Sequence, residues 1–380
     1  MKRVADIAVI GAGCMGLSIA WHLARAGAGR VIVIDQRGVA TGATANSSAI
    51  LRTHYENPAL ASMAWHGLKV FSDFEAIAGG PSGFRKTGFL FLGGKKDAAA
   101  IRKTSRAIRA LGINSVILEA GEFHHIEART SRDDIGVVIW EPESGHASAS
   151  VASATLADAA RRSGAEISTG ETVISITGRK GRVTGIESTA GKLAVGTVVV
   201  AAGFRSMGLL EPLGVKLPLT PVRHPIAVVT TAGSHPVAPV VGDRILGAYH
   251  RPEGSNQFLV GRYGFMDGDR DESVEEAKPA RATALESLLK AFKARWPYEA
   301  NARLARSYTG VYDCTPDLEP ALGPVAGVDG LHVAAGFSGH GFKLSPAVGE
   351  MVAGGITGDS SRIARADRFD VRRFELRSLK

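Results

Sequence analysis

The chain has 380 residues, of which 45% are hydrophobic, and a formal net charge of +8. This length allows two domains or one large α/β domain with an ample core. Basic residues are dispersed along the chain, and acidic residues interrupt the densest basic segment, the C-terminal ARADRFDVRRFELRSLK. We therefore expect a solvated tail and no nucleic-acid partner, while the positive charge favours anionic small molecules.

The cysteines and the apolar runs exclude further classes of protein. Cys14 and Cys314 lie far apart and form no CxxC pair, which excludes a disulfide framework and a thiolate metal cluster. No apolar run reaches the length of a membrane span, and the basic opening MKRVADIAVIGAG lacks a signal-peptide cleavage site. We expect a cytoplasmic protein with no metal site and no membrane span.

The N-terminal segment predicts a dinucleotide site. A buried-strand run leads into GxGxxG at Gly11, Gly13 and Gly16, a helical pattern follows, and the next apolar run ends at Asp35. These glycines permit the turn, the approach of a pyrophosphate and helix packing, in that order, while the carboxylate can accept hydrogen bonds from ribose hydroxyls. The glycines alone leave NAD and FAD open. Neighbouring candidate contacts of the cofactor are Cys14, Met15, Gln36 and Arg37.

The following stretch, TGATANSSAILRTHY at residues 41–55, is small and polar until Ile50. Such a segment can lie flat against an extended ligand. A flexible surface loop is the alternative, although AILR indicates a return into the core. The candidate cofactor contacts in this stretch are Ala43, Thr44, Ser47 and Ser48.

The middle of the chain predicts helices first and strands later. The expected helices span 58–78, 97–111 and 150–164, and an expected strand spans 88–94. Ser150 is the expected N-cap of the third helix, and Gly164 ends it. Residues 165–189 alternate as short strands and a hairpin, which supplies Val173 as a candidate cofactor contact.

Residues 196–206 have the pattern of a buried strand that runs into Ala201, Ala202 and Gly203. We expect this strand to join the first parallel sheet and to carry these three small residues to the nucleotide. Residues 215–265 are rich in strands separated by Pro and Gly turns, which indicates a largely antiparallel sheet in a second domain. A helix is expected over 274–295.

The C-terminal stretch GFSGHGFKLSP, residues 336–346, places Lys343 beside a run of glycines. A glycine run indicates a close approach to the backbone or a positive φ, and a cation beside it indicates an anion. With this stretch, the chain resembles the flavin-dependent amine oxidoreductases of the D-amino-acid-oxidase superfamily. The other segments that carry the resemblance are GAGCMG, GATANSSAILRTHYENP, VVVAAG and TPDLEPALGPV.

The resemblance covers nearly the whole chain and is strongest for the branch of sarcosine oxidase, dimethylglycine dehydrogenase and amino-acid dehydrogenases. It implies an α/β (α+β overall) fold with a Rossmann-like FAD-binding domain and a second, mostly antiparallel-sheet substrate domain that is discontinuous in sequence. The expected FAD-binding domain comprises 1–80, 145–210 and 311–380, and the expected substrate-binding domain comprises 81–144 and 211–310.

The resemblance also implies that the C-terminal glycine turn lies against the flavin. Backbone N–H groups near Gly341 and Phe342, at the start of a helix, would stabilise negative charge on the reduced ring, in agreement with the helix dipole. His340 is either a polar neighbour of the flavin or a packed turn residue. The candidate cofactor contacts in this turn are Gly339, His340, Gly341, Phe342 and Lys343.

In this branch, the residues that match Arg52 and Lys343 bind the substrate carboxylate, a task that suits a planar guanidinium and a point charge. The alternatives are an ion pair of Arg52 with Glu56 and a surface position for Lys343. Tyr312 matches an aromatic position that faces the substrate, or it is a core tyrosine with a satisfied hydroxyl. Tyr249 is a weaker aromatic candidate.

Two departures from the branch bear on the chemistry. Monomeric sarcosine oxidases carry a cysteine that bonds covalently to the flavin, but the matching position is Gly310, and Cys314 lies in the wrong register. We therefore expect non-covalent FAD. The lysine with which those oxidases activate oxygen matches Leu259, which favours a dehydrogenase with another electron acceptor.

The expected reaction is hydride transfer to flavin N5 from a carbon attached to nitrogen, which gives an imine that water hydrolyses. The expected substrate is a small carboxylate-bearing amine, either an amino acid or an N-substituted amino acid. One alternative is a 2-hydroxy-acid dehydrogenase of the same fold, with His340 or His54 as its base. The other is a flavoprotein subunit of a hetero-oligomeric amine or opine oxidase complex that works with partner subunits.

Overall fold

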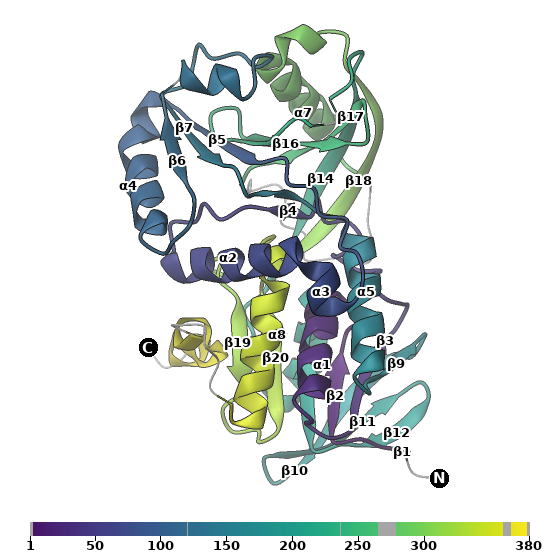
Figure 1. Cartoon of the computed structure of the whole chain (residues 1–380). Helices are drawn as coiled ribbons and strands as arrows, with labels where there is room; N and C mark the ends of the chain where they lie inside the picture. Colours follow the sequence, from purple (N-terminus) through teal and green to yellow (C-terminus); the bar gives the residue numbers. More distant parts are fainter. Residues whose placement is uncertain (1–2, 120, 236, 265–278, 360–365, 378–380) are drawn as a thin grey trace.

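The computed structural model describes residues 3–119, 121–235, 237–264, 279–359 and 366–377. It consists of two parts, each built on a large β-sheet, with helix α2 (Pro58–Ser72) between them (Figure 1). The fold class predicted from the sequence is confirmed, because one sheet is mainly parallel and the other mainly antiparallel.

The six-stranded sheet has the spatial order β19–β20–β13–β2–β3–β9, in which only β19 is antiparallel to its neighbour. Its strands are β2 (Ile7–Ile10), β3 (Val31–Asp35), β9 (Glu166–Thr169), β13 (Thr197–Val200), β19 (Ala321–Pro324) and β20 (Leu331–Ala335). The central strands are runs of apolar, largely β-branched residues, as strands buried on both faces require. The expected entry of the 196–206 segment into this sheet is confirmed, since Val200 pairs with Ile10.

This sheet is the middle of three layers. Three helices pack on one face (Figure 1), and they are α1 (Cys14–Arg25), α5 (Ala149–Arg162) and α8 (Gly341–Thr357). A four-stranded sheet covers the other face and contains β1 (Arg3–Val4), β12 (Gly191–Ala194), β11 (Arg182–Ser188) and β10 (Val173–Arg179). Successive side chains of a strand point to opposite faces of the sheet and so contribute to both cores. Val9 packs with the helices, and Ile10 packs with the small sheet.

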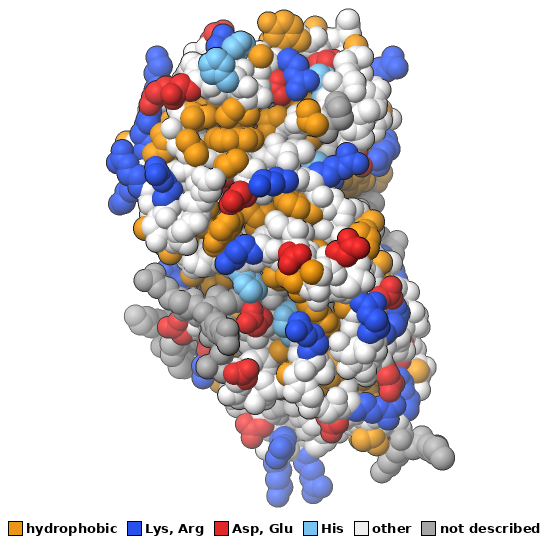
Figure 2. Space-filling model, viewed as in Figure 1, with side chains coloured by type: hydrophobic (Ala, Val, Ile, Leu, Met, Phe, Trp, Pro, Cys, Tyr) orange, Lys and Arg blue, Asp and Glu red, His pale blue; other side chains and the backbone are white. Residues whose placement is uncertain are grey.

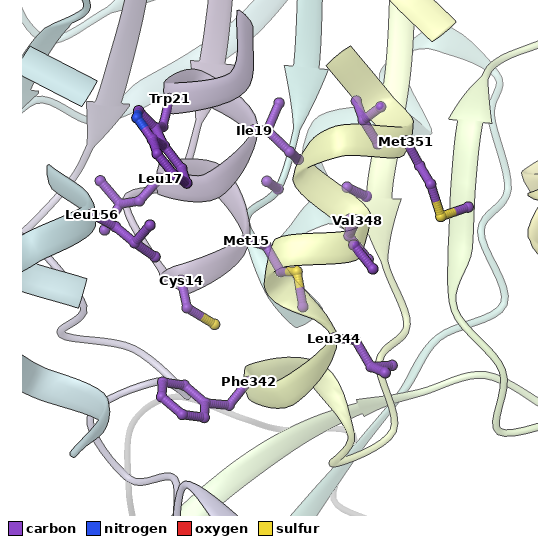
Figure 3. Packing of buried hydrophobic residues seen from close by; sticks show 14 of the residues in the cluster. Cys14, Met15, Leu17, Ile19, Trp21, Leu156, Phe342, Leu344, Val348 and Met351 are labelled. Carbon is purple, nitrogen blue, oxygen red and sulfur yellow. The ribbon is translucent and has the colours of Figure 1, made fainter. Parts of the chain in front are cut away.

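Helices α1 and α8 pack closely because a glycine lies at their contact. A Cβ on Gly349 would come within 2.2 Å of the Ser18 Oγ. Figure 3 shows Met15 of α1 beside Val348 of α8, with Phe342 at the start of α8 below them. The two N-termini therefore meet at the same end of the layer, where the glycine motif and the C-terminal glycine turn also lie.

The eight-stranded sheet has the order β18–β14–β17–β16–β15–β5–β7–β6, in which only β15 and β5 pair in parallel. The strands are β5 (Phe89–Gly93), β6 (Val116–Leu118), β7 (Val137–Glu141), β14 (Thr220–Thr230), β15 (Val240–Asp243), β16 (Ala248–Glu253), β17 (Gln257–Arg262) and β18 (Arg303–Cys314). Helix α7 (Ala282–Arg295) covers one face through Phe292, which packs against Phe258. Helix α4 (Ala98–Arg109) lies along β7.

Short elements join the two parts. Strand β4 (Ile50–Leu51) pairs with β8 (Gly145–His146). Helix α3 (Phe74–Ala78) follows α2 after a break at Asp73, where a single helix over 58–78 was expected. Helix α6 (Ser206–Leu210) follows β13. The predicted domain boundary after residue 310 falls inside β18, and the domain partition stays a prediction.

One expected helix end was wrong, and another lies outside the described residues. The N-cap of α5 is Ser148, whose Oγ accepts a hydrogen bond from the Val151 N–H, so the helix begins one residue before Ser150. The last helix before β18 begins at Ala282, and the expected start at 274 lies outside the described residues.

The C-terminal segment is not a solvated tail throughout. Phe369 and Val371 are 1% and 3% exposed and pack against the two cores of the six-stranded sheet. Ion pairs hold the same segment, with Arg373 on Asp317 and Arg368 on Glu319. The apolar residues that alternate with the charges therefore serve as packing residues.

The visible surface in Figure 2 mixes both signs of charge, with basic side chains scattered among acidic ones. Among the described residues, no helix is long and apolar enough to cross a membrane. No group of three or more His, Cys, Asp or Glu side chains in the described ranges is arranged to hold a metal ion.

Candidate active site

A cavity of about 1100 Å³ opens at the carboxyl ends of the parallel strands and extends to the eight-stranded sheet. This is the edge at which open α/β sheets bind their ligands. Of the residues that the sequence predicted, the cavity is lined by Gly11, Gly13, Cys14, Met15, Asp35, Gln36, Arg37, Ala43, Thr44, Ser47, Ser48, Arg52, Val173, Ala201, Ala202, Gly203, Tyr249, Tyr312, Gly339, His340, Gly341, Phe342 and Lys343. Gly16 lies outside the lining, and a Cβ there would sit 1.9 Å from the Gly11 carbonyl oxygen.

The glycine turn between β2 and α1 is built for a close backbone approach. Gly11 has φ +108°, and a Cβ on it would meet the Ala201 carbonyl oxygen at 2.5 Å. The Asp35 carboxylate accepts hydrogen bonds from the Ala12 N–H at 2.8 Å and the Arg37 N–H at 2.9 Å. These contacts hold the start of α1 toward the cavity, so the residues present fit the pyrophosphate of a dinucleotide.

The end of the cavity near Val173 contains an acidic residue that the sequence analysis missed. Glu171 is 4% exposed, and Arg3 donates to it at 2.7 and 3.0 Å. The Ser168 and Ser188 hydroxyls also donate to this carboxylate. The hydrogen bonds from Arg3 and the serines hold the pKa of Glu171 at about 2, against the effect of burial.

Arg52 and Lys343 converge on the ring of Tyr55. We call them the carboxylate clamp, after the role that the family resemblance predicts for them. The Arg52 guanidinium lies 4.3 Å from the ring centroid and donates to the His54 carbonyl at 2.5 Å, and the Lys343 ammonium lies 6.0 Å from the same centroid. Lys343 is 7% exposed, so the surface alternative is wrong. The expected alternative partner, Glu56, instead lies 4.0 Å from Arg244.

The electrostatics of the clamp follow from its burial. Burial and the nearby Arg52 lower the pKa of Lys343 to about 7. His340 donates to or accepts from the Tyr55 hydroxyl at 3.1 Å, and burial, with Lys343 and Arg52, lowers its pKa well below the ordinary value. His340 is therefore a neutral polar neighbour of the cavity. His54 stacks on Phe91 at 4.6 Å and lies outside the lining.

Aromatic side chains from the eight-stranded sheet form the opposite wall. Tyr312 stacks on His224 at 4.6 Å, and the Tyr249 hydroxyl lies 2.6 Å from the Ser48 Oγ and 3.4 Å from the His224 Nε2. Sequence analysis missed His224. Its signal is the period of two along β14, on which it shares a face with Ile226 and Val228.

The structure shows where the two positions lie at which this sequence differs from the sarcosine oxidases. Leu259 is buried against Ile226 and Val228 and does not line the cavity, whereas Arg262 at the end of the same strand does. Gly310 lies opposite Asn46, and Cys314 is buried outside the lining. The thiol within the lining belongs to Cys14, and burial raises its pKa to about 11.

A buried carboxyl fixes the C-terminal glycine turn. Asp313 accepts hydrogen bonds from the Gly336 N–H at 2.7 Å and the Phe337 N–H at 3.3 Å. Burial raises its pKa to about 6, although both N–H groups oppose the shift. A Cβ on Gly339 would meet the Tyr312 ring at 2.7 Å, so this turn passes directly over the aromatic wall.

A glycine turn and a cavity at the edge of a parallel sheet, closed by a second, antiparallel sheet, define a nucleotide-binding protein of the α/β class. The chain belongs to the DAO family of FAD-dependent oxidoreductases, whose family model matches residues 6–354. The resemblance found in the sequence is therefore confirmed.

Individual relatives place the chain within this family. It is 24% identical to human mitochondrial dimethylglycine dehydrogenase over 370 residues, which cover 93% of this chain and 42% of the relative. It is 24% identical to sarcosine oxidase subunit beta from Rhizobium meliloti, with 96% and 88% covered. The crystal structure of L-proline dehydrogenase from P. horikoshii superposes with a TM-score of 0.91 at 25% identity and covers 99% of both chains. The chain thus spans less than half the length of the dimethylglycine dehydrogenase.

Proposed function

We propose that this chain oxidises the C–N bond of a small amino acid or N-substituted amino acid, with FAD as the hydride acceptor. The observation that carries the proposal is the carboxylate clamp, in which two cations from distant parts of the chain face one cavity beside the glycine turn. A carboxylate is the anion that a guanidinium and an ammonium can hold together. The names of the relatives, which include a dehydrogenase of dimethylglycine, an oxidase subunit for sarcosine and a dehydrogenase of L-proline, support the substrate class.

FAD fits the residues on both sides of the cavity. Gly11 and Gly13 would hold the pyrophosphate at the start of α1, and the turn from Gly339 to Lys343 would lie against the ring system. When bound, FAD accepts the hydride at N5. We propose a non-covalent complex, because Gly310 has no nucleophile and the Cys14 thiol is protonated. Because the residues that would hold FAD lie in 1–80, 145–210 and 311–380, we propose that these segments form the FAD-binding domain.

The clamp would act on the substrate in two ways. Arg52 and Lys343 would fix the carboxylate, so that the carbon beside the nitrogen points to the flavin site. Their positive field would also lower the pKa of the substrate ammonium, which is about 10 in water, and favour the neutral amine that can release hydride. Tyr312 and His224 would exclude water from the opposite side. No separate general base is required.

We propose a dehydrogenase rather than an oxidase, with an electron acceptor other than oxygen. The support is the buried Leu259, which offers no cation where the related oxidases use a lysine. Arg262 is the cation that this strand does bring to the cavity. This choice is tested by the rate of flavin reoxidation in air and the rate with an artificial acceptor. Both rates are measured in the wild type and in Leu259→Lys. Fast reoxidation of the wild type in air would make it an oxidase.

Two other functions are weaker. A 2-hydroxy-acid dehydrogenase needs a base at the flavin, and His340, with its strongly lowered pKa, is a poor one. A subunit that transfers electrons within a hetero-oligomer is supported by the 88% coverage of sarcosine oxidase subunit beta. Copurification of a partner, or turnover that appears only when one is added, would favour this function.

The decisive experiment is anaerobic bleaching of the flavin absorbance with a panel of sarcosine, proline, D-amino acids, opines and 2-hydroxy acids. We expect an amino acid or an N-substituted amino acid to bleach the flavin, and Lys343→Met to raise the substrate concentration required. Bleaching by 2-hydroxy acids alone would refute the C–N chemistry. A folded, FAD-supplemented protein without flavin absorbance would refute the whole proposal. Colour retained in the acid-precipitated protein would refute the non-covalent complex.

A further inference from the structure

A buried acid, Glu141, lies behind the carboxylate clamp, and the sequence analysis did not single it out. It is the last residue of β7, is 1% exposed and does not line the cavity. On the neighbouring strand β5 it pairs with Phe89, which lines the cavity and whose ring centroid lies 5.9 Å from the Arg52 guanidinium. The acid is therefore one strand away from an aromatic residue that the clamp approaches.

One oxygen of this carboxyl group accepts two hydrogen bonds. The Glu141 Oε2 accepts from the Ser144 Oγ and from the Thr53 N–H, each at 2.8 Å. Ser144 follows three residues later in the chain, so the first bond belongs to the turn after β7. Thr53 is 88 residues away in the sequence, so the second bond fixes a segment that the turn does not contain. A buried N–H that loses its acceptor is costly, and this bond therefore contributes to the order of that segment.

Thr53 links this acid to the clamp because it lies between Arg52 and His54 in the chain. Its N–H belongs to the peptide group that follows Arg52, so Glu141 directly fixes the backbone of the arginine. The Arg52 Nη1 in turn donates to the His54 carbonyl at 2.5 Å. On the other side, strand β4 is fixed by its pairing with β8. The backbone is therefore held both before and after Arg52.

The charges of the two side chains also act on each other. Against the effect of burial, Tyr55, Tyr263 and Glu141 raise the pKa of Arg52. Burial raises the pKa of Glu141, while its hydrogen bonds and the charge of Arg52 oppose this shift. Buried opposite charges lessen each other's cost of desolvation. The acid is thus a hydrogen-bond acceptor for the backbone at Arg52 and a counter-charge for its guanidinium.

We propose that Glu141 is a positioning residue of the clamp, which holds the backbone at Arg52 through the Thr53 N–H and so fixes where the guanidinium meets a substrate carboxylate. This inference rests on the proposed function, because it assumes that the clamp binds a carboxylate. A binding group whose supporting contacts let it move by about 1 Å loses affinity. If the acid only stabilised the turn after β7, its replacement would leave Arg52 in place.

Two substitutions test the role of the acceptor. Glu141→Gln keeps an oxygen that can accept both hydrogen bonds, whereas Glu141→Met removes the acceptor with a side chain of similar size. Carboxylate affinity is measured by the change in flavin absorbance when the FAD-loaded protein is titrated with propionate, which has no amine to oxidise. We expect affinity within about threefold of the wild type for Glu141→Gln and at least about tenfold weaker for Glu141→Met. In an Arg52→Met background, the effect of Glu141→Met should disappear.

Glu299 provides the matched control. It is a carboxylate that is 6% exposed, lies outside the cavity lining and accepts hydrogen bonds from the Ala232 N–H and the Gly233 N–H. Glu299→Met should therefore lower stability and leave propionate binding unchanged. Glu141→Asp, which keeps the charge and withdraws the oxygen by one methylene, is the milder variant if Glu141→Met does not hold FAD, and it should bind propionate more weakly than Glu141→Gln.

A second measurement needs no ligand. The side-chain NMR resonance of Arg52 in ¹⁵N-labelled protein, assigned by its loss in Arg52→Met, should shift far more in Glu141→Met than in Glu141→Gln. An unchanged resonance in Glu141→Met would overturn the proposal, as would a loss of affinity that persists in the Arg52→Met background. A wild type without saturable propionate binding would refute the carboxylate role of the clamp, and the resonance would then decide the positioning of Arg52 by itself.

Discussion

The ring of Tyr55 lies under the guanidinium of Arg52 at 4.3 Å, and the hydroxyl of the same ring lies 3.1 Å from the His340 Nδ1. The Lys343 ammonium is also within 6.0 Å of this ring. One buried side chain therefore contacts both cations of the carboxylate clamp and the imidazole beside them, although it does not line the cavity. We therefore expect Tyr55 to position the two cations and the imidazole.

This geometry predicts different effects for two substitutions of Tyr55. Tyr55→Leu removes the ring, and the loss of a desolvated cation–π contact of about 2 kcal/mol should raise KM roughly 30-fold. Tyr55→Phe keeps the ring and removes only the hydroxyl, so KM should change by less than about threefold. Steady-state kinetics on the identified substrate, with flavin content as a control for folding, measure both. An equal rise in KM for the two variants would contradict the role of the ring.

The lowered pKa of Lys343 predicts a pH-dependent carboxylate affinity. In the ligand-free protein, Lys343 is charged below pH 7 and loses its proton as the pH rises through about 7. A bound carboxylate favours the charged form, so binding above pH 7 takes up a proton and the affinity falls by up to about tenfold per pH unit. Calorimetry of a non-reactive carboxylate in buffers of different ionisation enthalpy measures this uptake. The uptake should vanish in Lys343→Met; its presence there would assign it to another group.

Asp313 predicts a pH dependence of stability with the opposite sign to that of most carboxylates. Burial raises its pKa to about 6, so between the ordinary value of 3.8 and about 6 the unfolded chain releases the proton first. The free energy of unfolding therefore falls in this window as the pH rises. Asp313→Asn, which remains neutral, should remove this part of the slope in denaturant unfolding measured from pH 4 to 6.

Asp317 provides the control for this measurement. Arg373 and the Glu319 N–H lower the pKa of Asp317 in spite of burial. Its contribution to the free energy of unfolding is therefore present at neutral pH and is lost as the pH falls. Asp317→Asn should therefore lower stability at neutral pH and have little effect at low pH. The same pH profile for both asparagine variants would contradict the assignment.

The contact between α2 and α8 predicts the effect of a single methyl group. A Cβ on Gly67 would lie 1.9 Å from the Lys343 carbonyl oxygen, which cannot move without moving the clamp. Gly67→Ala should lower the free energy of unfolding by about 1–3 kcal/mol and weaken substrate binding. Gly355→Ala, in an open position of α8, should instead stabilise by up to about 1 kcal/mol. Denaturant unfolding with the flavin bound compares them, and a neutral Gly67→Ala would show that α2 can shift.

The sequence predicted the parts of the site that depend on local backbone geometry. The glycine motif, the small residues after β13 and the turn before α8 are each recognisable within about ten residues, and all their predicted contacts except Gly16 line one cavity. The pairing of Arg52 with Lys343 came from the family resemblance, because no local pattern joins residues so far apart. The structure adds the Tyr55 ring, which both cations approach.

The residues that sequence analysis missed act through distant contacts. His224 lines the cavity because β14 lies between β17 and β18, and Asp313 acts because the 336–338 backbone passes its carboxylate. The contact of Asp313 with this turn has no local signal, and the period of two along β14 gives the face on which His224 lies but not that this face borders the cavity. The wrong N-cap of α5 has a different cause, since serine at 148 and at 150 offers two equivalent caps and propensity alone does not distinguish them.

The order of the six-stranded sheet has a consequence for how the protein matures. Neighbouring strands come from the beginning, the middle and the end of the chain, so the cavity edge forms only after very long loops have closed. Such topologies have high contact order and fold slowly. FAD can therefore be captured only by a nearly complete fold, and the appearance of flavin colour during refolding should report the last stage of folding and not the first.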